Sequence, residues 1–138
     1  LVEDLKIQAA DLGIAENVWF GGYVENANRY IGLFDVYVNS SRSEGMPITL
    51  LESMRGSIPV VASNVGDNKA LVSKSSAKLL FDSEDYKKLA TLIDNLLNDS
   101  VKRKQVGLEL NNIFLSSHTS EKMCSAYTKI YEQSAFIR

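Results

Sequence analysis

The sequence predicts an α/β fold in which a parallel β-sheet is covered by helices on both faces. Two observations support this prediction. Short apolar runs end in polar or glycine-bearing loops, and the runs are continuous, as is typical of strands buried on both sides. Segments of helical periodicity lie between these runs. Because ligands of such sheets bind beyond the carboxyl ends of the strands, the loops after the runs are the candidate sites.

Four apolar runs are expected as strands, each followed by residues that favour turns. The loops after the first three runs are residues 21–26, 40–46 and 63–68. The runs themselves are residues 18–20, 35–39, 58–62 and 77–81.

Helical periodicity predicts helices before, between and after these strands. The one that follows the second strand opens with Pro47 and ends at Gly56, residues favoured at these two positions. The clearest amphipathic stripe follows the fourth strand, with Asp82 or Ser83 as the expected cap. The expected helices are residues 1–12, 47–55, 86–97, 101–114 and a last one, entered through Thr119 or Ser120, that includes 123–131.

Composition indicates an ordinary globular domain of 138 residues, with 45% hydrophobic and 23% charged residues. A net charge of -2 argues against non-specific binding to nucleic acid or anionic lipid. The single Cys124 and single His118 exclude an intrachain disulfide and a cysteine- or histidine-based metal site. We expect Cys124 to pack in the last helix and His118 to lie at the surface or cap a helix. No apolar run approaches the roughly 20 residues of a membrane span.

The segment 40–54 carries the strongest chemical signal. It places Glu44 in a strand-to-helix loop and Glu52 on the helix that follows. Gly45 allows close approach of a ligand to the backbone, and Pro47 opens the helix, whose unpaired amides and dipole form a seat for phosphate oxygens. Side chains on a helix lean toward its N-terminus, so the Glu52 carboxylate is expected to reach the same cleft as Glu44.

Here the sequence resembles a known family. Glu44 and Glu52, seven residues apart, resemble the Glu-x7-Glu motif of the family-four retaining glycosyltransferases (glycosyl transferases group 1), which have the GT-B architecture. Residues 12–24 resemble the family's "LGI-x-ENV-x-F-x-GYV" stretch, and 35–38 its "DV-x-V" strand. Residues 56–66 resemble its "PVVAS-x-VG" segment. The resemblance covers nearly the whole chain and implies a Rossmann-like parallel sheet with flanking helices.

The resemblance also implies roles for residues of the segment. Glu44 corresponds to the catalytic-site acidic residue that contacts hydroxyls of the transferred sugar, and Glu52 to the one that holds the ribose hydroxyls. Gly45, Met46 and Pro47 would lead the diphosphate to the helix N-terminus. The alternative interpretation is simpler: Glu44 caps its helix, and Glu52 is a solvated surface charge.

Tyr23 and Val24 occupy the loop where this family usually holds the nucleotide base. The implied donor is a nucleotide-diphospho-sugar linked to UDP or GDP, bound without a metal or other cofactor, so protein groups would meet the diphosphate charge. We expect Arg42 and Lys69 to be exposed loop cations rather than phosphate ligands.

The sequence departs from the family pattern in several places. Near position 70 the family has a glutamate, whereas this chain has Asp67-Asn68-Lys69-Ala70, and residues 73–76 replace a glycine-containing turn. The family's sheet, ordered 3-2-1-4-5-6, would need two further strands between residues 18–20 and 35–38. We therefore expect a single, N-terminally truncated domain (1–138) that belongs to a longer parent or is stabilised by another chain, because open sheet edges tend to pair or aggregate.

The expected function is donor binding in a glycosyltransferase that assembles a surface polysaccharide, such as capsule or lipopolysaccharide. A glycan or lipid-linked acceptor would bind to a domain outside this chain, which alone would be inactive. We expect no nucleic-acid partner, and a cytoplasmic location that is at most peripheral to the inner face of the membrane. The alternatives are an inert nucleotide-binding or interaction module of the same fold and a GT-B sugar-nucleotide epimerase.

Overall fold

A three-stranded parallel sheet forms the centre of the protein in the computed structural model, which describes residues 1–72 and 76–135. The strand order is β1-β2-β3, and every residue of the central strand β2 is buried. This confirms the predicted parallel α/β fold, although the strands are shorter than the apolar runs. The strands are β1 (Tyr37–Asn39), β2 (Val60–Ser63) and β3 (Leu80–Phe81).

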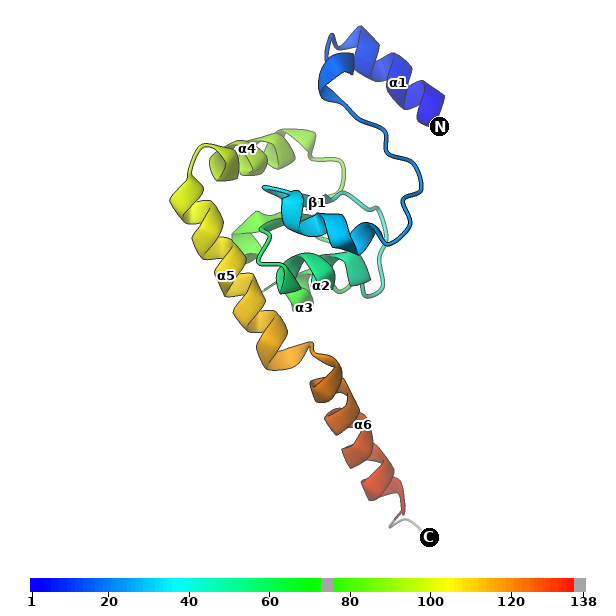
Figure 1. Cartoon of the computed structure of the whole chain (residues 1–138), viewed down its shortest axis with the longest axis vertical. Helices are drawn as coiled ribbons and strands as arrows, with labels where there is room; N and C mark the ends of the chain where they lie inside the picture. Colours follow the sequence, from blue (N-terminus) through cyan, green and yellow to red (C-terminus); the bar gives the residue numbers. More distant parts are fainter. Residues whose placement is uncertain (73–75, 136–138) are drawn as a thin grey trace.

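Helices cover both faces of the sheet, as Figure 1 shows. Val60 and Ala62 of β2 belong to one apolar cluster, with residues of α2 (Ile48–Arg55) and α5 (Ser100–Ser117). Val61 belongs to the other cluster, with residues of α4 (Tyr86–Leu97). This alternation follows from the period-two direction of side chains along a strand. The continuous apolar run of β2 is therefore explained by burial on both sides.

The ends of the helices show which predicted caps form. Pro47 is the N-cap of α2 rather than its first helical residue, and Gly56 closes that helix by donating its amide to the Glu52 carbonyl. The predicted caps of α4 are wrong, because Asp85 holds that position and its carboxylate accepts the Lys88 amide at 3.0 Å. A carboxylate is favoured there because it satisfies an amide that has no partner in the helix.

The predicted strand 18–20 is wrong. These residues form a connector outside the sheet, and Trp19 is 84% exposed. The connector leads from α1 (Val2–Asp11) and the short 3-10 helix η1 (Ala15–Asn17), which project from the body in Figure 1, to the next helical element at Ala27. Within the described residues, β1 pairs only with β2, so no neighbouring strand is present to order this segment into the sheet.

The C-terminal helix α6 (Ser120–Ala135) extends away from the body (Figure 1). It begins next to Thr119, whose hydroxyl accepts the Lys122 amide, as predicted. Cys124 is exposed, so the prediction that it is a packing residue of this helix is wrong within the described part of the chain. The apolar stripe of the helix is exposed, and its side chains are Met123, Tyr127, Ile130 and Tyr131.

Three smaller elements complete the fold. The 3-10 helix η2 (Ala27–Leu33) packs against α2, and α3 (Asn68–Leu71) follows the loop after β2. A further 3-10 helix, η3 (Ser76–Leu79), leads into β3 where the sequence predicted a longer strand. The predicted turn at 73–76 falls mostly outside the described residues. His118 is the C-cap of α5, where its backbone amide donates to the Phe114 carbonyl.

Candidate functional site

The loop after β1 holds the Glu44 carboxylate in a defined place. The Ser41 hydroxyl donates to Glu44 Oε1 at 2.6 Å, and the Asn39 amide nitrogen donates to the same oxygen at 3.1 Å. Asn39 also accepts the Ser41 backbone amide through its own side-chain oxygen at 3.3 Å. Glu44 therefore bonds within its own loop, and the alternative that it caps α2 is wrong, since α2 has no side-chain cap.

These two hydrogen bonds set the charge of the carboxylate. The bond from Ser41 and, to a smaller extent, that from Asn39 lower the pKa of Glu44 below its ordinary value of 4.5. Both donors favour the ionised form, which accepts their hydrogen bonds. Glu44 is therefore an anionic acceptor at neutral pH. Its side chain is half-buried, so the carboxylate remains accessible to a ligand.

The loop after β2 packs against this first loop. The Ser63 hydroxyl donates to the Ser41 carbonyl at 2.7 Å, and the Asp67 amide donates to the Gly45 carbonyl at 3.3 Å. Gly66 has a φ of +50° and lies against the Glu44 backbone, so closely that a Cβ would stand 1.9 Å from the Glu44 carbonyl oxygen. The two loops meet because the carboxyl ends of parallel strands lie at one edge of the sheet.

The start of α2 follows directly after Glu44. Pro47 is buried, whereas Gly45 and Met46 are exposed. The first helical amides, those of Ile48 and Thr49, donate to no group among the described residues. Unpaired amides at a helix N-terminus favour an anion. The expected seat for phosphate oxygens is thus adjacent to the Glu44 carboxylate in the chain.

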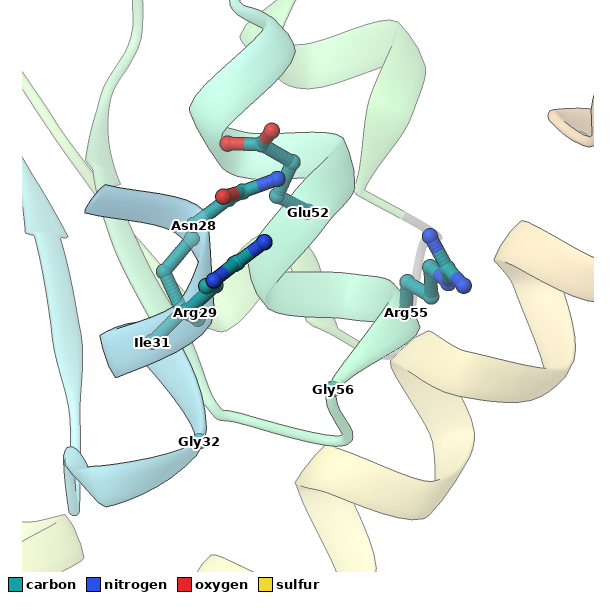
Figure 2. Close-up of a pocket in the computed structure, with 7 residues that line it drawn as sticks. All are labelled: Asn28, Arg29, Ile31, Gly32, Glu52, Arg55 and Gly56. Atoms are coloured by element: carbon teal, nitrogen blue, oxygen red, sulfur yellow. The ribbon is translucent and has the colours of Figure 1, made fainter. Parts of the chain in front are cut away.

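Glu52 lies in the wall of an open pocket of about 320 Å³ between η2 and α2. Figure 2 shows its carboxylate facing the side chain of Asn28, with the guanidinium of Arg29 in the same space and Arg55 pointing away from these three. The four polar side chains give the pocket a mixed charge. Sequence reasoning missed Asn28 and Arg29, because nothing in the spacing of η2 places it beside α2.

Glu52 also borders a larger and mostly apolar pocket of about 630 Å³. Thr49, whose hydroxyl accepts a hydrogen bond from the Tyr37 hydroxyl at 2.7 Å, lines it together with Glu52. Val24, predicted as a base contact, lines this pocket. Tyr23 does not line it and is 93% exposed. The apolar walls come from Trp19, Val24, Ala27, Tyr30, Ile31, Leu33, Phe34 and Tyr37.

The pockets described above do not bring the two predicted carboxylates together, so the expectation that Glu52 reaches the same cleft as Glu44 is not confirmed. Glu52 lines both pockets described above, whereas Glu44 lines neither of them. The hydrogen-bonding residues around Glu44 were not singled out from the sequence, although Asn39, Ser41 and Ser63 all stand at or just after the ends of strands. Polar residues at that place in a parallel sheet are the signal that could have found them.

The other loop residues behave as the simpler interpretations expect. Arg42 forms an exposed ion pair with Glu84 at 2.9 Å, and Lys69 is exposed. In the segment that departs from the family pattern, Asn68 is buried, and its amide donates to the Ser63 carbonyl at 2.8 Å. This hydrogen bond connects the first residue of α3 to the last residue of β2, across the loop between them.

Residues 1–72 and 76–135 contain neither a metal-binding cluster nor a membrane-spanning helix. No set of three or more histidine, cysteine, aspartate and glutamate side chains there is arranged to bind a metal ion. No helix in the same part of the chain has the length and apolar character needed to cross a membrane.

Comparison with known proteins supports a shared ancestry. The family described as "Glycosyl transferases group 1" matches residues 2–109. The O-antigen biosynthesis glycosyltransferase WclY of Escherichia coli is 32% identical over 116 residues, which cover 84% of this chain and 31% of WclY. The lipopolysaccharide core biosynthesis mannosyltransferase LpsB of Rhizobium meliloti is 31% identical over 98 residues, covering 70% of this chain and 28% of LpsB. The chain thus spans about a third of the length of these relatives.

Two solved structures share the fold. Sucrose-phosphate synthase from Thermosynechococcus elongatus superposes with a TM-score of 0.86 at 21% identity, covering 99% of this chain and 35% of that one. The C-terminal domain of a glycosyl transferase group 1 family protein (LpcC) from Francisella tularensis gives a TM-score of 0.77 at 19% identity. That comparison covers 86% of this chain and 62% of the other.

Proposed function

Because the chain belongs to the glycosyl transferases group 1 family and has the fold of its C-terminal domain, we propose that it binds the nucleotide-sugar donor of a retaining glycosyltransferase. One observation carries this proposal. The ionised Glu44 carboxylate is held by two donors immediately before the unpaired amides of α2. An acceptor for sugar hydroxyls thus precedes a seat for the diphosphate.

The proposal divides the donor among three parts of the surface. Glu44 accepts hydrogen bonds from hydroxyls of the transferred sugar, and Gly45, Met46 and Pro47 lead the diphosphate to the start of α2. Glu52 accepts from the ribose hydroxyls, for which a carboxylate that forms no ion pair among the described residues is suited. The apolar pocket beside Val24 takes the face of the base, since its walls are almost entirely carbon.

Transfer with retention then proceeds through a transition state with oxocarbenium character on the sugar. In this proposal Glu44 orients the donor and does not attack it. The donor is a UDP- or GDP-linked sugar bound without a metal ion, and the amides of α2 stabilise the negative charge that develops on the leaving diphosphate. Such preorganised donors act without reorganisation during the reaction.

The acceptor binds outside this chain, in the remainder of a longer protein. The names of the relatives support a glycan or a lipid-linked acceptor, since they include O-antigen and lipopolysaccharide-core enzymes and a galactosyltransferase acting on a diphosphoundecaprenol-linked sugar. We place the reaction on the cytoplasmic side of the membrane. The unpaired edge of β1 would pair with a further strand of that protein or with a second copy.

Calorimetric titration of the chain with UDP, GDP and their sugar conjugates tests the proposal. We expect the chain to bind either the UDP ligands or the GDP ligands. We expect no transfer of sugar to a glycan acceptor by this chain alone. Absence of binding to every ligand would favour the inert module, for which the departure at Asp67–Ala70 is the supporting feature. Product analysis of the complete parent without acceptor would reveal an epimerase.

A further inference from the structure

We propose that Ser63, at the end of the strand next to Glu44, is a positioning residue that fixes the Glu44 carboxylate through Ser41. The proposal deepens the function suggested for Glu44 and rests on it for its consequence in ligand binding. The positioning itself is independent of the ligand. It also explains two features that donor binding alone leaves open: a buried serine in β2 and the bonding of both protein donors to a single oxygen of Glu44.

Two hydrogen bonds in series connect the sheet to the carboxylate. The Ser63 hydroxyl donates to the Ser41 carbonyl at 2.7 Å, and the Ser41 hydroxyl donates to Glu44 Oε1 at 2.6 Å. Ser63 is completely buried on the central strand, whereas Ser41 is half-buried in the loop. The rigid end of the chain of bonds is therefore the sheet, and the accessible end is the carboxylate.

The identity of residue 63 has no explanation within the sheet. A fully buried strand favours β-branched apolar residues, and a buried hydroxyl costs free energy unless it is hydrogen-bonded. The Ser63 hydroxyl finds its partner in the loop after β1 rather than in its own strand. Serine at this position is therefore accounted for by the need to hold Ser41.

The loop after β2 adds a second restraint on the same segment. Gly66 lies against the Glu44 carbonyl, and the Asp67 amide donates to the Gly45 carbonyl at 3.3 Å. Ser63 therefore restrains the backbone before Glu44, at Ser41. The turn at Gly66 and Asp67 restrains it at Glu44 and Gly45. Such a restraint limits the directions in which the carboxylate can point.

The bonding leaves one carboxylate oxygen for a ligand. Both protein donors, Asn39 and Ser41, bond to Oε1, and Oε2 accepts no hydrogen bond from the described residues. A carboxylate can accept on both oxygens. The geometry therefore assigns the sugar hydroxyl to Oε2, at a place set in advance by Ser63 and Ser41. Preorganised acceptors bind more tightly because less freedom is lost on binding.

The first test follows Glu44 itself in the free chain, by NMR titration of its carboxyl carbon. In Ser63→Ala the Ser41 backbone loses its anchor, so we expect the Glu44 midpoint to rise, and Ser41→Ala to raise it further. Ser53→Ala is the matched control, because Ser53 is also fully buried and bonds to a backbone carbonyl, that of Thr49, away from Glu44. A midpoint that rises in Ser41→Ala and stays unchanged in Ser63→Ala overturns the proposal.

The second test compares a nucleotide sugar with the corresponding nucleoside diphosphate. We expect Ser63→Ala to weaken binding of the sugar conjugate by roughly tenfold, the worth of about one hydrogen bond, and to leave the diphosphate nearly unaffected. An equal loss for both ligands would mean general structural damage and overturns the proposal. If the wild-type chain binds no nucleotide sugar while the Glu44 midpoint still depends on Ser63, the proposed function fails and the positioning role stands.

Discussion

The α-carbon of Gly66 faces the Glu44 carbonyl oxygen so closely that a Cβ placed on it would lie 1.9 Å from that oxygen. No side chain can occupy this space without moving the loop that carries the candidate acidic residue. The φ of +50° at Gly66 adds to this, because residues other than glycine rarely adopt that backbone conformation. The contact thus ties the position of Glu44 to the residue type at 66.

Gly66→Ala is therefore expected to displace the Glu44 loop and lower the melting temperature. Left-handed strain alone costs roughly 1–2 kcal/mol, and relief of the clash adds to it. The control is Gly22→Ala, since Gly22 has a φ of +61° but open space around its α-carbon. Thermal unfolding of both variants measures the difference. Equal losses would mean that the contact with Glu44 has no energetic weight.

A second close approach fixes α5 against the turn between α2 and β2. A Cβ at Gly107 would lie 2.0 Å from the Ser57 carbonyl oxygen. Alanine normally stabilises a helix relative to glycine, by about 1 kcal/mol. Here we expect the opposite sign, with Gly107→Ala destabilising the domain by about 1–3 kcal/mol through overpacking. Urea unfolding decides the sign, with the exposed Lys104→Ala on the same helix as the control.

The lowered pKa of Glu44 predicts a pH dependence of stability. Its folded pKa lies below the ordinary value of 4.5, because Ser41 and then Asn39 donate to the ionised form. The stabilisation is thus fully present above that value and is lost as the pH falls through the folded pKa. Melting temperatures of wild type and Glu44→Gln, measured from pH 7 to pH 3, should converge toward the acid end. A constant gap across this range would contradict the prediction.

Asp85 rather than Asp82 caps α4, so the two aspartates should differ on substitution. Asp85→Ala removes the acceptor of the Lys88 amide and is expected to cost about 1 kcal/mol. Asp82→Ala removes only a long contact of 3.5 Å with Asn64 and should cost much less. Chemical denaturation of the two variants, which have the same change in charge, compares them directly. A larger loss for Asp82→Ala would favour the cap predicted from the sequence.

The sequence predicted the parts of the fold that depend on local pattern. The run 58–62 contains most of the buried strand β2, whose apolar side chains pack on both faces of the sheet, and α2 lies between Pro47 and Gly56 as expected. The cap of α4 was missed because Asp82, Ser83 and Asp85 all suit an N-cap. Only the turn in which the Asp85 amide donates to the Asp82 carbonyl decides among them.

The failures concern segments whose structure depends on partners distant in sequence. Residues 18–20 have the composition of a strand, but a strand forms only beside another strand, and none lies next to them among the described residues. Cys124 belongs to a helix with an apolar stripe, yet nothing described covers that stripe. Similarly, the spacing of Glu44 and Glu52 identified both carboxylates, but it gave no sign of Ser63, whose hydroxyl donates to the Ser41 carbonyl from the next strand of the sheet.

The two carboxylates should be separable by ligand. Glu44 is proposed to contact only the transferred sugar. Glu44→Gln is therefore expected to weaken binding of a nucleotide sugar by roughly tenfold and to leave binding of the nucleoside diphosphate nearly unchanged. Glu52 is proposed to bind the ribose, which both ligands contain, so Glu52→Gln should weaken the binding of both to the same extent. Its effect should shrink for the 2′-deoxynucleotide, which lacks one of the hydroxyls.

Calorimetry with the three ligands measures all of these differences in one protein preparation. The two variants are matched in size and in loss of charge, and the side chains stand on separate parts of the surface, with Glu52 in the pocket walls and Glu44 outside them. General disruption of the fold would weaken the binding of every ligand in both variants. If Glu44→Gln reduces binding of the diphosphate as much as that of the conjugate, Glu44 contacts the nucleotide and the proposed division of the donor is incorrect.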